Sequence, residues 1–201
     1  MLKKIMYQKD NIMHLFENFM TPDEADKIET AMLALPWYFN TIEGNLSNAS
    51  QDTPVYFVNL IGCESHGTTS DDIKPFVPLI LKLEKITGRS FKERISRVKA
   101  NLYTKRPDFP ENFHHKPHLD FYNEETKLGD EGEVLLYYGN TSDGDTYFFN
   151  EKRIDTKTLT ITDQFPHIKG NGLLFDNTIL HASSSPRISE YRMNINFVFR
   201  K

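Results

Sequence analysis

The sequence contains a single cysteine, Cys63, among its 201 residues. One cysteine cannot form an intrachain disulfide, so a disulfide-stabilised fold is excluded. A bound metal ion would then depend on His, Asp and Glu side chains for its ligands. The cysteine count also fits a reducing compartment, and we expect a cytoplasmic protein.

Long apolar runs are lacking as well. No run approaches the roughly 18 residues that a membrane-spanning helix needs. The first residues, from Met1 to Lys4, are not followed by the apolar stretch of a signal peptide. We therefore expect no membrane partner. The formal net charge of −4 gives no general reason to expect a nucleic-acid partner, although a local basic groove remains compatible with it.

The remaining composition is that of an ordinary globular protein, with 38% hydrophobic and 26% charged residues. The length suits a single domain over 1–201. Its first part, 1–91, mixes helix and strand patterns. A capping box and an apolar stripe predict a helix over 21–35, and a strand is predicted over 54–62. A second helix is predicted over 70–87; Pro78 leaves open a start after that residue.

From about residue 92 the hydrophobic period changes to two, which is typical of strands. Short strands separated by Gly, Asn, Asp and Pro predict a mainly β barrel of about eight strands, flanked by the N-terminal helices (α+β). The expected strands cover 95–103, 118–122, 133–139, 145–149, 157–162, 172–176, 179–183 and 191–199. The barrel core is therefore expected over 92–201, with 1–91 as a buttress.

The sequence His118-Leu119-Asp120 is the first candidate for a metal site. In an extended strand, residues i and i+2 point to the same face, so an imidazole and a carboxylate would lie side by side. His181 is the candidate third ligand. Two His and one carboxylate on one face of an octahedron leave three positions open, as in non-haem Fe(II) oxygenases. A His-x-Asp pair alone is a weak signal, and surface or capping positions are the alternative for the other histidines, His114 and His115 included.

The last strand predicts a polar lining beside this site. Arg192, Asn194 and Asn196 alternate with apolar residues. In a simple sandwich the polar face would meet solvent, whereas in a barrel with a polar cavity it would point inward. A guanidinium at Arg192 could then bind a dicarboxylic acid through two hydrogen bonds. Asn101 and Tyr103 share one face of the strand over 95–103 and could point into the same cavity.

These motifs, in this order, resemble the Fe(II)/2-oxoglutarate-dependent oxygenases, most closely the prolyl 4-hydroxylase-like branch. The resemblance covers about residues 92–200 and includes a tyrosine pair, Tyr137-Tyr138, of which one member has to face inward. Some turn sequences also resemble oxygenases of phages and marine microbes. The resemblance implies a double-stranded β-helix, a jelly-roll or cupin-like barrel. It implies His118, Asp120 and His181 as catalytic iron ligands, and Arg192, Tyr103, Tyr138 and Asn101 as residues that bind 2-oxoglutarate.

The implied reaction takes Fe(II), 2-oxoglutarate and O₂, hydroxylates a C–H bond and releases succinate and CO₂. The irregular segment 104–117 leads into the His-x-Asp pair, and loops at a barrel mouth commonly select the substrate. Its mixed apolar, basic and acidic residues favour a peptide, prolyl-type substrate over nucleic acid; a small molecule is also compatible. Two alternatives remain. One is an AlkB-type nucleic-acid demethylase, although Val198 stands where that branch has a second arginine. The other is a non-catalytic cupin-like binding module.

Overall fold

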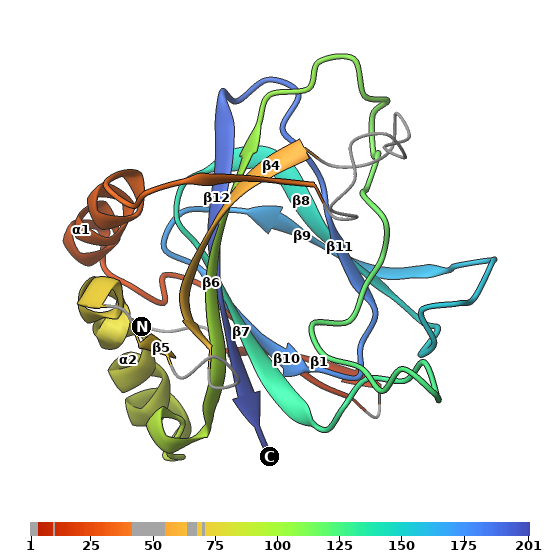
Figure 1. Cartoon of the computed structure of the whole chain (residues 1–201), viewed down its shortest axis with the longest axis horizontal. Coiled ribbons are helices and arrows are strands. Elements are labelled where there is room, and N and C mark those ends of the chain that lie inside the picture. Colours follow the sequence, from red (N-terminus) through yellow and green to blue (C-terminus); the bar gives the residue numbers. More distant parts are fainter. Residues whose placement is uncertain (1–3, 10, 42–54, 64–67, 70) are drawn as a thin grey trace.

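In this computed structural model the described residues are 4–9, 11–41, 55–63, 68–69 and 71–201. Two antiparallel β-sheets form a barrel, and two helices lie on the outer side of the larger sheet (Figure 1). No helix among the described residues is both long enough and apolar enough to span a membrane. Mainly β structure with few helices is therefore confirmed.

The larger sheet has nine strands and combines segments from both parts of the chain. Its order is β1 (Lys4–Lys9), β2 (Asn11–Phe16), β10 (Gly172–Asp176), β7 (Gly132–Tyr138), β12 (Tyr191–Arg200), β6 (Ile95–Thr104), β4 (Val55–Cys63) and β3 (Tyr38–Thr41), with β5 (Thr68–Thr69) paired to β4. The smaller sheet is β11 (His181–Ser183), β8 (Ser142–Phe149) and β9 (Ile161–His167). The central strands of this sheet thus come from the part of the chain after residue 92, whereas the strands at both of its edges come from the part before residue 92.

The two helices begin and end where local chemistry dictates. In α1 (Pro22–Leu33) the Thr21 hydroxyl accepts from the backbone N–H of Glu24, and the Glu24 carboxylate accepts from the backbone N–H of Thr21 at 2.9 Å. A 3₁₀ helix, η3 (Asp71–Phe76), precedes α2 (Val77–Thr87). The latter starts before Pro78, because proline is tolerated in a first helical turn. Gly88, with a φ of 68°, ends it.

The helices and the outer face of the larger sheet share one hydrophobic core. From α1 it takes Ala25, Ile28 and Met32, from α2 Leu79, Ile80 and Leu83, and from β12 Met193, Ile195, Phe197 and Phe199. The alternation of β12 therefore divides the strand: its apolar face packs on the helices and its polar face is left for the interior.

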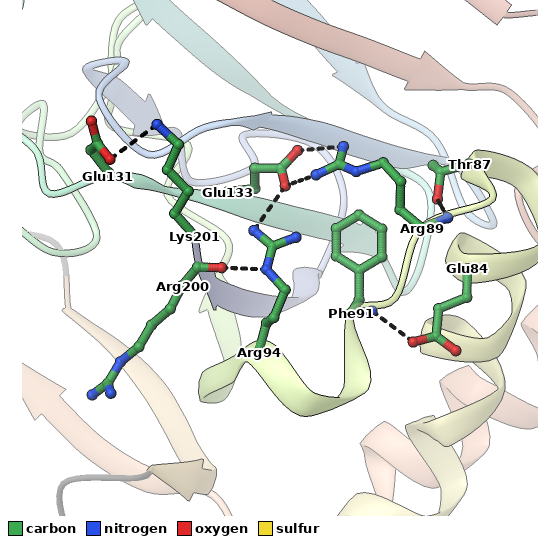
Figure 2. Close-up of polar contacts among 9 residues, drawn as sticks. All are labelled: Glu84, Thr87, Arg89, Phe91, Arg94, Glu131, Glu133, Arg200 and Lys201. Carbon is green, nitrogen blue, oxygen red and sulfur yellow. Dashed lines mark hydrogen bonds and ion pairs between the residues drawn. The ribbon is translucent and has the colours of Figure 1, made fainter.

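The loop after α2 is tied to the sheet by a polar cluster (Figure 2). The Glu84 carboxylate accepts from the backbone N–H of Phe91 at 2.7 Å. The Arg89 and Arg94 guanidiniums both donate to Glu133 on β7, and both lie over the Phe91 ring, 4.9 and 5.4 Å from its centroid. This cluster fixes the start of β6, whose inner face carries several of the predicted site residues.

Two predicted strands are wrong in part. Residues 118–122 form no strand; isolated bridges pair His118 with His181 and Tyr122 with Gly129. The proline before His118 has no N–H to continue a ladder, so seven strands follow residue 92 instead of about eight. The strand expected over 157–162 is β9, displaced toward the C-terminus. It contains Pro166 and lies at a sheet edge, where a missing N–H costs no ladder bond.

The sequence reading also missed β1, β2, β3 and β5, which precede residue 92. The strands expected over 95–103, 133–139, 172–176 and 191–199 are confirmed within one residue at each end, and those expected over 145–149 and 179–183 have shifted starts in β8 and β11. The main elements of the barrel are therefore readable from hydrophobic period, whereas the strands that extend the larger sheet at its two edges are not.

Leu83 tests the packing between α2 and the sheet. Its side chain is fully buried, so Leu83→Ala should lower the free energy of unfolding by about 2–5 kcal/mol through lost burial and a residual cavity. Leu81 on the same helix is 54% exposed and is the matched control; Leu81→Ala should cost far less. Urea unfolding of both variants measures the difference, and equal costs would contradict this packing.

Candidate metal centre and co-substrate pocket

A cavity of about 350 Å³ lies between the two sheets. Its walls are the inner faces of β6 and β12, parts of β8 and β11, and the residues around His118. Five of the predicted site residues line it, namely Asn101, Tyr103, His118, His181 and Arg192. The polar face of β12 therefore points inward, as the barrel interpretation of its alternation predicts.

His118, Asp120 and His181 form a compact cluster at this cavity. Their ligand atoms all lie within 4.8 Å of one another, close enough to hold one metal ion. Two backbone hydrogen bonds join His118 to His181: each N–H donates to the other's carbonyl, at 2.9 and 3.1 Å. The segment 118–122 is irregular, so this bridge to β11, and not a regular strand, brings the His-x-Asp pair to His181.

Both imidazoles of the cluster are held in the form that binds metal. Burial lowers the pKa of His118 to about 3, and burial likewise lowers the pKa of His181, so both rings are neutral at pH 7. His181 Nδ1 lies 3.1 Å from the carbonyl of Ile179 and donates to it as the protonated ring nitrogen. Nε2 is thereby left as a lone-pair donor, and it lies 3.5 Å from Asp120 Oδ2.

Asp120 is oriented by an arginine that the sequence reading did not single out. Arg97 on β6 donates to Asp120 Oδ1 through one guanidinium nitrogen and to the Asp120 carbonyl through another, at 3.2 Å. Burial raises the pKa of Asp120, but Arg97 and then His181 outweigh burial and hold that pKa below its ordinary value. Oδ2 is buried and has no hydrogen-bond partner among the described residues. One oxygen is thus anchored while the other is available to a metal.

Arg192 stands at the other end of the cavity and is fully buried. Its Nε donates to the Gly144 carbonyl at 2.8 Å, and its Nη2 donates to Thr146 Oγ1 at 3.1 Å. Nη1 is buried without a hydrogen-bond partner among the described residues. The guanidinium is therefore fixed by β8 and keeps one donor unused.

The other predicted co-substrate residues surround this guanidinium. Arg192 lies 5.3 Å from the centre of the Tyr103 ring, and burial raises the pKa of Tyr103. Tyr138 points inward and donates to Thr146 Oγ1 at 3.1 Å, whereas Tyr137 packs in the outer core with the helices. Of the tyrosine pair, Tyr138 is thus the member that faces inward, and its hydroxyl contacts Thr146.

Asn101 lies on the cavity wall between the metal cluster and Arg192. Its Nδ2 donates to Asn194 Oδ1 at 2.9 Å, and its own Oδ1 is buried without a hydrogen-bond partner in the described part of the chain. The pairing of Asn101 with Asn194 across β6 and β12 fixes both amides against the wall.

Several lining residues were missed by sequence reasoning, among them Lys99, Thr146 and Ser183. The alternation of β6 would have found Lys99, because it shares the face of Asn101 and Tyr103. His115 also lines the cavity: its ring stacks on Tyr103 at 5.5 Å, and burial lowers its pKa to about 3. His114 instead packs against the rings of Tyr147 and Phe149. Neither histidine belongs to the metal cluster.

The donor set fits a metal ion and a dicarboxylate together. The cluster offers two neutral imidazoles and a carboxylate oxygen with no hydrogen-bond partner among the described residues, as a facial triad requires. Arg192 offers a guanidinium N–H that is likewise unpaired within the described part of the chain, which suits a carboxylate. Buried polar groups are seldom left unpaired unless a ligand satisfies them. The cavity is therefore built for a polar ligand that reaches from the cluster to Arg192.

Comparison with known proteins gives matches at the level of structure alone, since the sequence matches no protein-family model and no curated protein. An oxidoreductase of the 2OG-Fe(II) oxygenase family from Burkholderia pseudomallei has a TM-score of 0.63 at 14% identity, over 94% of this chain and 85% of that one. A prolyl hydroxylase from Trichoplax adhaerens, in complex with a hypoxia inducible factor peptide fragment, has a TM-score of 0.59 at 14% identity, over 93% and 83%.

A third structure, the alpha-ketoglutarate-dependent epimerase SnoN from nogalamycin biosynthesis, has a TM-score of 0.58 at 10% identity, over 94% of this chain and 80% of that one. At these identities the similarity concerns the fold. The expected double-stranded β-helix is confirmed on this ground: the chain has the fold of the 2-oxoglutarate/Fe(II) oxygenases, prolyl hydroxylases among them.

Proposed function

We propose that this chain is an Fe(II)- and 2-oxoglutarate-dependent dioxygenase that hydroxylates a C–H bond and releases succinate and CO₂. The observation that carries the proposal is that one cavity combines a His/Asp/His cluster with a buried arginine, of which one N–H has no partner among the described residues. A non-catalytic cupin-like module would more often have lost one of the three cluster residues or Arg192. This combination therefore supports an enzyme over the non-catalytic alternative.

The chain's own residues have three tasks in this reaction. His118, Asp120 and His181 would hold the iron on one face. Arg192 would bind the far carboxylate of 2-oxoglutarate, with Tyr103, Tyr138 and Asn101 around it. When bound, iron, 2-oxoglutarate and O₂ supply the oxidising chemistry. The cavity walls would shield it from solvent on their side, and no side chain has to act as a general base.

The substrate we propose is a peptide, with prolyl-type hydroxylation as the leading candidate. One protein with this fold is a prolyl hydroxylase in complex with a peptide fragment, which supports a peptide at the barrel mouth. The end of the segment 104–117 reaches the cavity through His115, Lys116 and Pro117. Phe109 and Phe113 pack on each other, 4.2 Å between ring centres, and both pack edge-on against the His115 ring.

The AlkB-type alternative makes a different prediction about products. A succinate-release assay with Fe(II) and 2-oxoglutarate, run across peptide, nucleotide and free amino-acid pools, tests the proposed function. Mass spectrometry should then find a gain of one oxygen on a proline-containing peptide. Loss of methyl from methylated oligonucleotides, with salt-sensitive binding and no peptide oxidation, would establish the demethylase in its place.

The metal ligands give the first functional test. His118→Ala, Asp120→Ala and His181→Ala should each abolish Fe(II) binding and turnover, because two remaining ligands cannot maintain the facial arrangement. An anaerobic Fe(II) titration measures the affinity. His114→Ala, a nearby histidine outside the cluster, is the control and should bind iron normally. Unchanged affinity in all three ligand variants would exclude this metal site.

Arg192 gives the second test. Arg192→Ala should raise the KM for 2-oxoglutarate about 10- to 150-fold, since a charge-assisted hydrogen bond contributes roughly 1.5–3 kcal/mol. Arg192→Lys should recover part of the loss, and thermal unfolding of both variants separates binding from folding. Arg187 is exposed, and Arg187→Ala should leave the KM unchanged. Equal effects at the two arginines would mean that the co-substrate binds elsewhere.

Arg97 gives the third functional test, because it positions Asp120 but does not itself line the cavity. Arg97→Gln should weaken Fe(II) affinity about 10- to 100-fold, as loss of a residue that orients a metal ligand commonly does. The KM for 2-oxoglutarate should change less. Arg89→Gln also breaks an arginine–carboxylate pair, but that pair with Glu133 is remote from the cluster. If both variants bind iron as the wild type does, Arg97 has no positioning role.

A further inference from the structure

Lys99 lies on the inner face of β6 and lines the cavity beside the metal cluster. Within the part of the chain that the structure describes, it forms no hydrogen bond and no ion pair. Burial and, after it, the nearby Arg97 lower the pKa of Lys99 to about 8, whereas Asp120 opposes both. At neutral pH the side chain is thus mostly an ammonium ion that no described residue neutralises by direct pairing.

No acidic residue in the described part of the chain is available to neutralise this charge. Among the described residues that line the cavity there is no Asp or Glu. Asp120 borders it, but Arg97 already pairs with one carboxylate oxygen and the other is the candidate metal ligand. Lys99 is half-buried, and an unpaired cation held partly out of water is costly; an anion that enters the cavity would reduce that cost.

The co-substrate has its own cation at a different place. In the pairing of β6 with β12, Arg192 lies opposite Tyr103, and Asn196 lies opposite Lys99. Four residues along a strand correspond to about 13 Å. Lys99 thus lies well along the strand from Arg192, and we treat the two cations as separate positions for anionic groups.

Asn196 adds a second polar group next to Lys99. Its Oδ1 is buried and has no hydrogen-bond partner among the described residues. Lys99 and Asn196 lie directly opposite each other in the strand pairing. The Lys99 ammonium can donate hydrogen bonds to a ligand, and the Asn196 side-chain oxygen can accept one from it. A molecule that carries a carboxylate close to an N–H group would satisfy both, as amino acids and peptides do.

We propose that Lys99 receives a carboxylate of the primary substrate, and that Asn196 accepts from an N–H of the same molecule. The substrate is then an acid whose oxidised C–H group lies between Lys99 and the metal cluster. This inference rests on the proposed function and names the substrate class for it. The carboxylate belongs to an acidic side chain of a peptide or to a free amino acid.

The experiment measures binding without turnover. Protein loaded with Zn(II) in place of iron, and with 2-oxoglutarate, is titrated by calorimetry with pairs of probes that differ in one charge. One set consists of short proline peptides with Glu or Gln beside the proline. The other consists of free amino acids and their carboxamides. The wild type should bind the acid of at least one pair ten-fold or more tightly than its amide, and the set that responds identifies the source of the carboxylate.

The variants assign this preference to Lys99. Lys99→Gln should reduce the preference to less than two-fold, while Lys99→Arg keeps most of it. Lys85→Gln removes the same charge from an exposed position on α2 and should change nothing. Binding of 2-oxoglutarate to Lys99→Gln should remain within two-fold of the wild type, which also shows that the variant is folded.

Two results would overturn the inference. The first is a wild type that prefers no acid over its amide in either set. The second is a Lys99→Gln variant that loses 2-oxoglutarate affinity to the same extent as acid affinity, because Lys99 would then bind the co-substrate. Failure of the proposed function looks different: the iron-loaded wild type would release no succinate, whereas the binding comparison would still give its answer.

Discussion

The antiparallel pairing of β6 with β12 is the constraint on which the rest of the structure depends. Nine residue pairs align the two strands, from Tyr191 opposite Thr104 to Phe199 opposite Ile95. Because side chains alternate along both strands, one register decides which face is apolar and which is polar. A shift by one residue would turn Arg192 toward the helices and Met193 into the cavity. The hydrophobic core and the candidate site are therefore fixed by the same hydrogen bonds.

This arrangement concentrates polar groups in the interior, and other parts of the chain hold the charged groups in place. Arg192 is held by Gly144 and Thr146, and Asp120 is held by Arg97. The buried atoms for which no described residue is a hydrogen-bond partner include Arg192 Nη1, Asp120 Oδ2, Asn101 Oδ1 and Asn196 Oδ1. Such groups weaken the free protein, since burial without hydrogen bonds costs free energy. Ligands that satisfy them would stabilise the folded state through binding linkage.

The parts of the site that depend on residue type and on the two-residue period of strands could be predicted from the sequence. The alternation of β12 placed Arg192 and Asn194 on an inward face, and that of β6 did so for Asn101 and Tyr103. The helix of α1 followed from its capping box. The strand geometry used to argue that His118 and Asp120 lie side by side does not exist there, whereas the candidate set of His118, Asp120 and His181 was also implied by the motif resemblance.

Other features could not be read in this way, for physical reasons. Pro166 within β9 looks like a strand breaker unless the edge position of that strand is known. Strands β1, β2 and β3 are defined by their partners in the sheet more than by their own pattern. Arg97 and Lys99 alternate in phase with Asn101 and Tyr103, but their different roles depend on the distance to Asp120. That distance is set by the irregular segment before β7, which has no periodicity to read.

Gly144 illustrates how a single small residue determines the position of the buried guanidinium. Its carbonyl accepts from Arg192 Nε at 2.8 Å, and a Cβ at this position would lie 2.8 Å from Arg192 Cδ and 2.7 Å from the Ser184 carbonyl oxygen. Neither contact can be relieved by a flexible side-chain end, because one involves backbone and the other a buried stem. Any larger residue at 144 would therefore displace the Arg192 stem or the Ser184 backbone. The hydrogen bonds that hold the guanidinium against β8 would then be strained or lost. The proposed position of the co-substrate carboxylate thus depends on the absence of one side chain in β8.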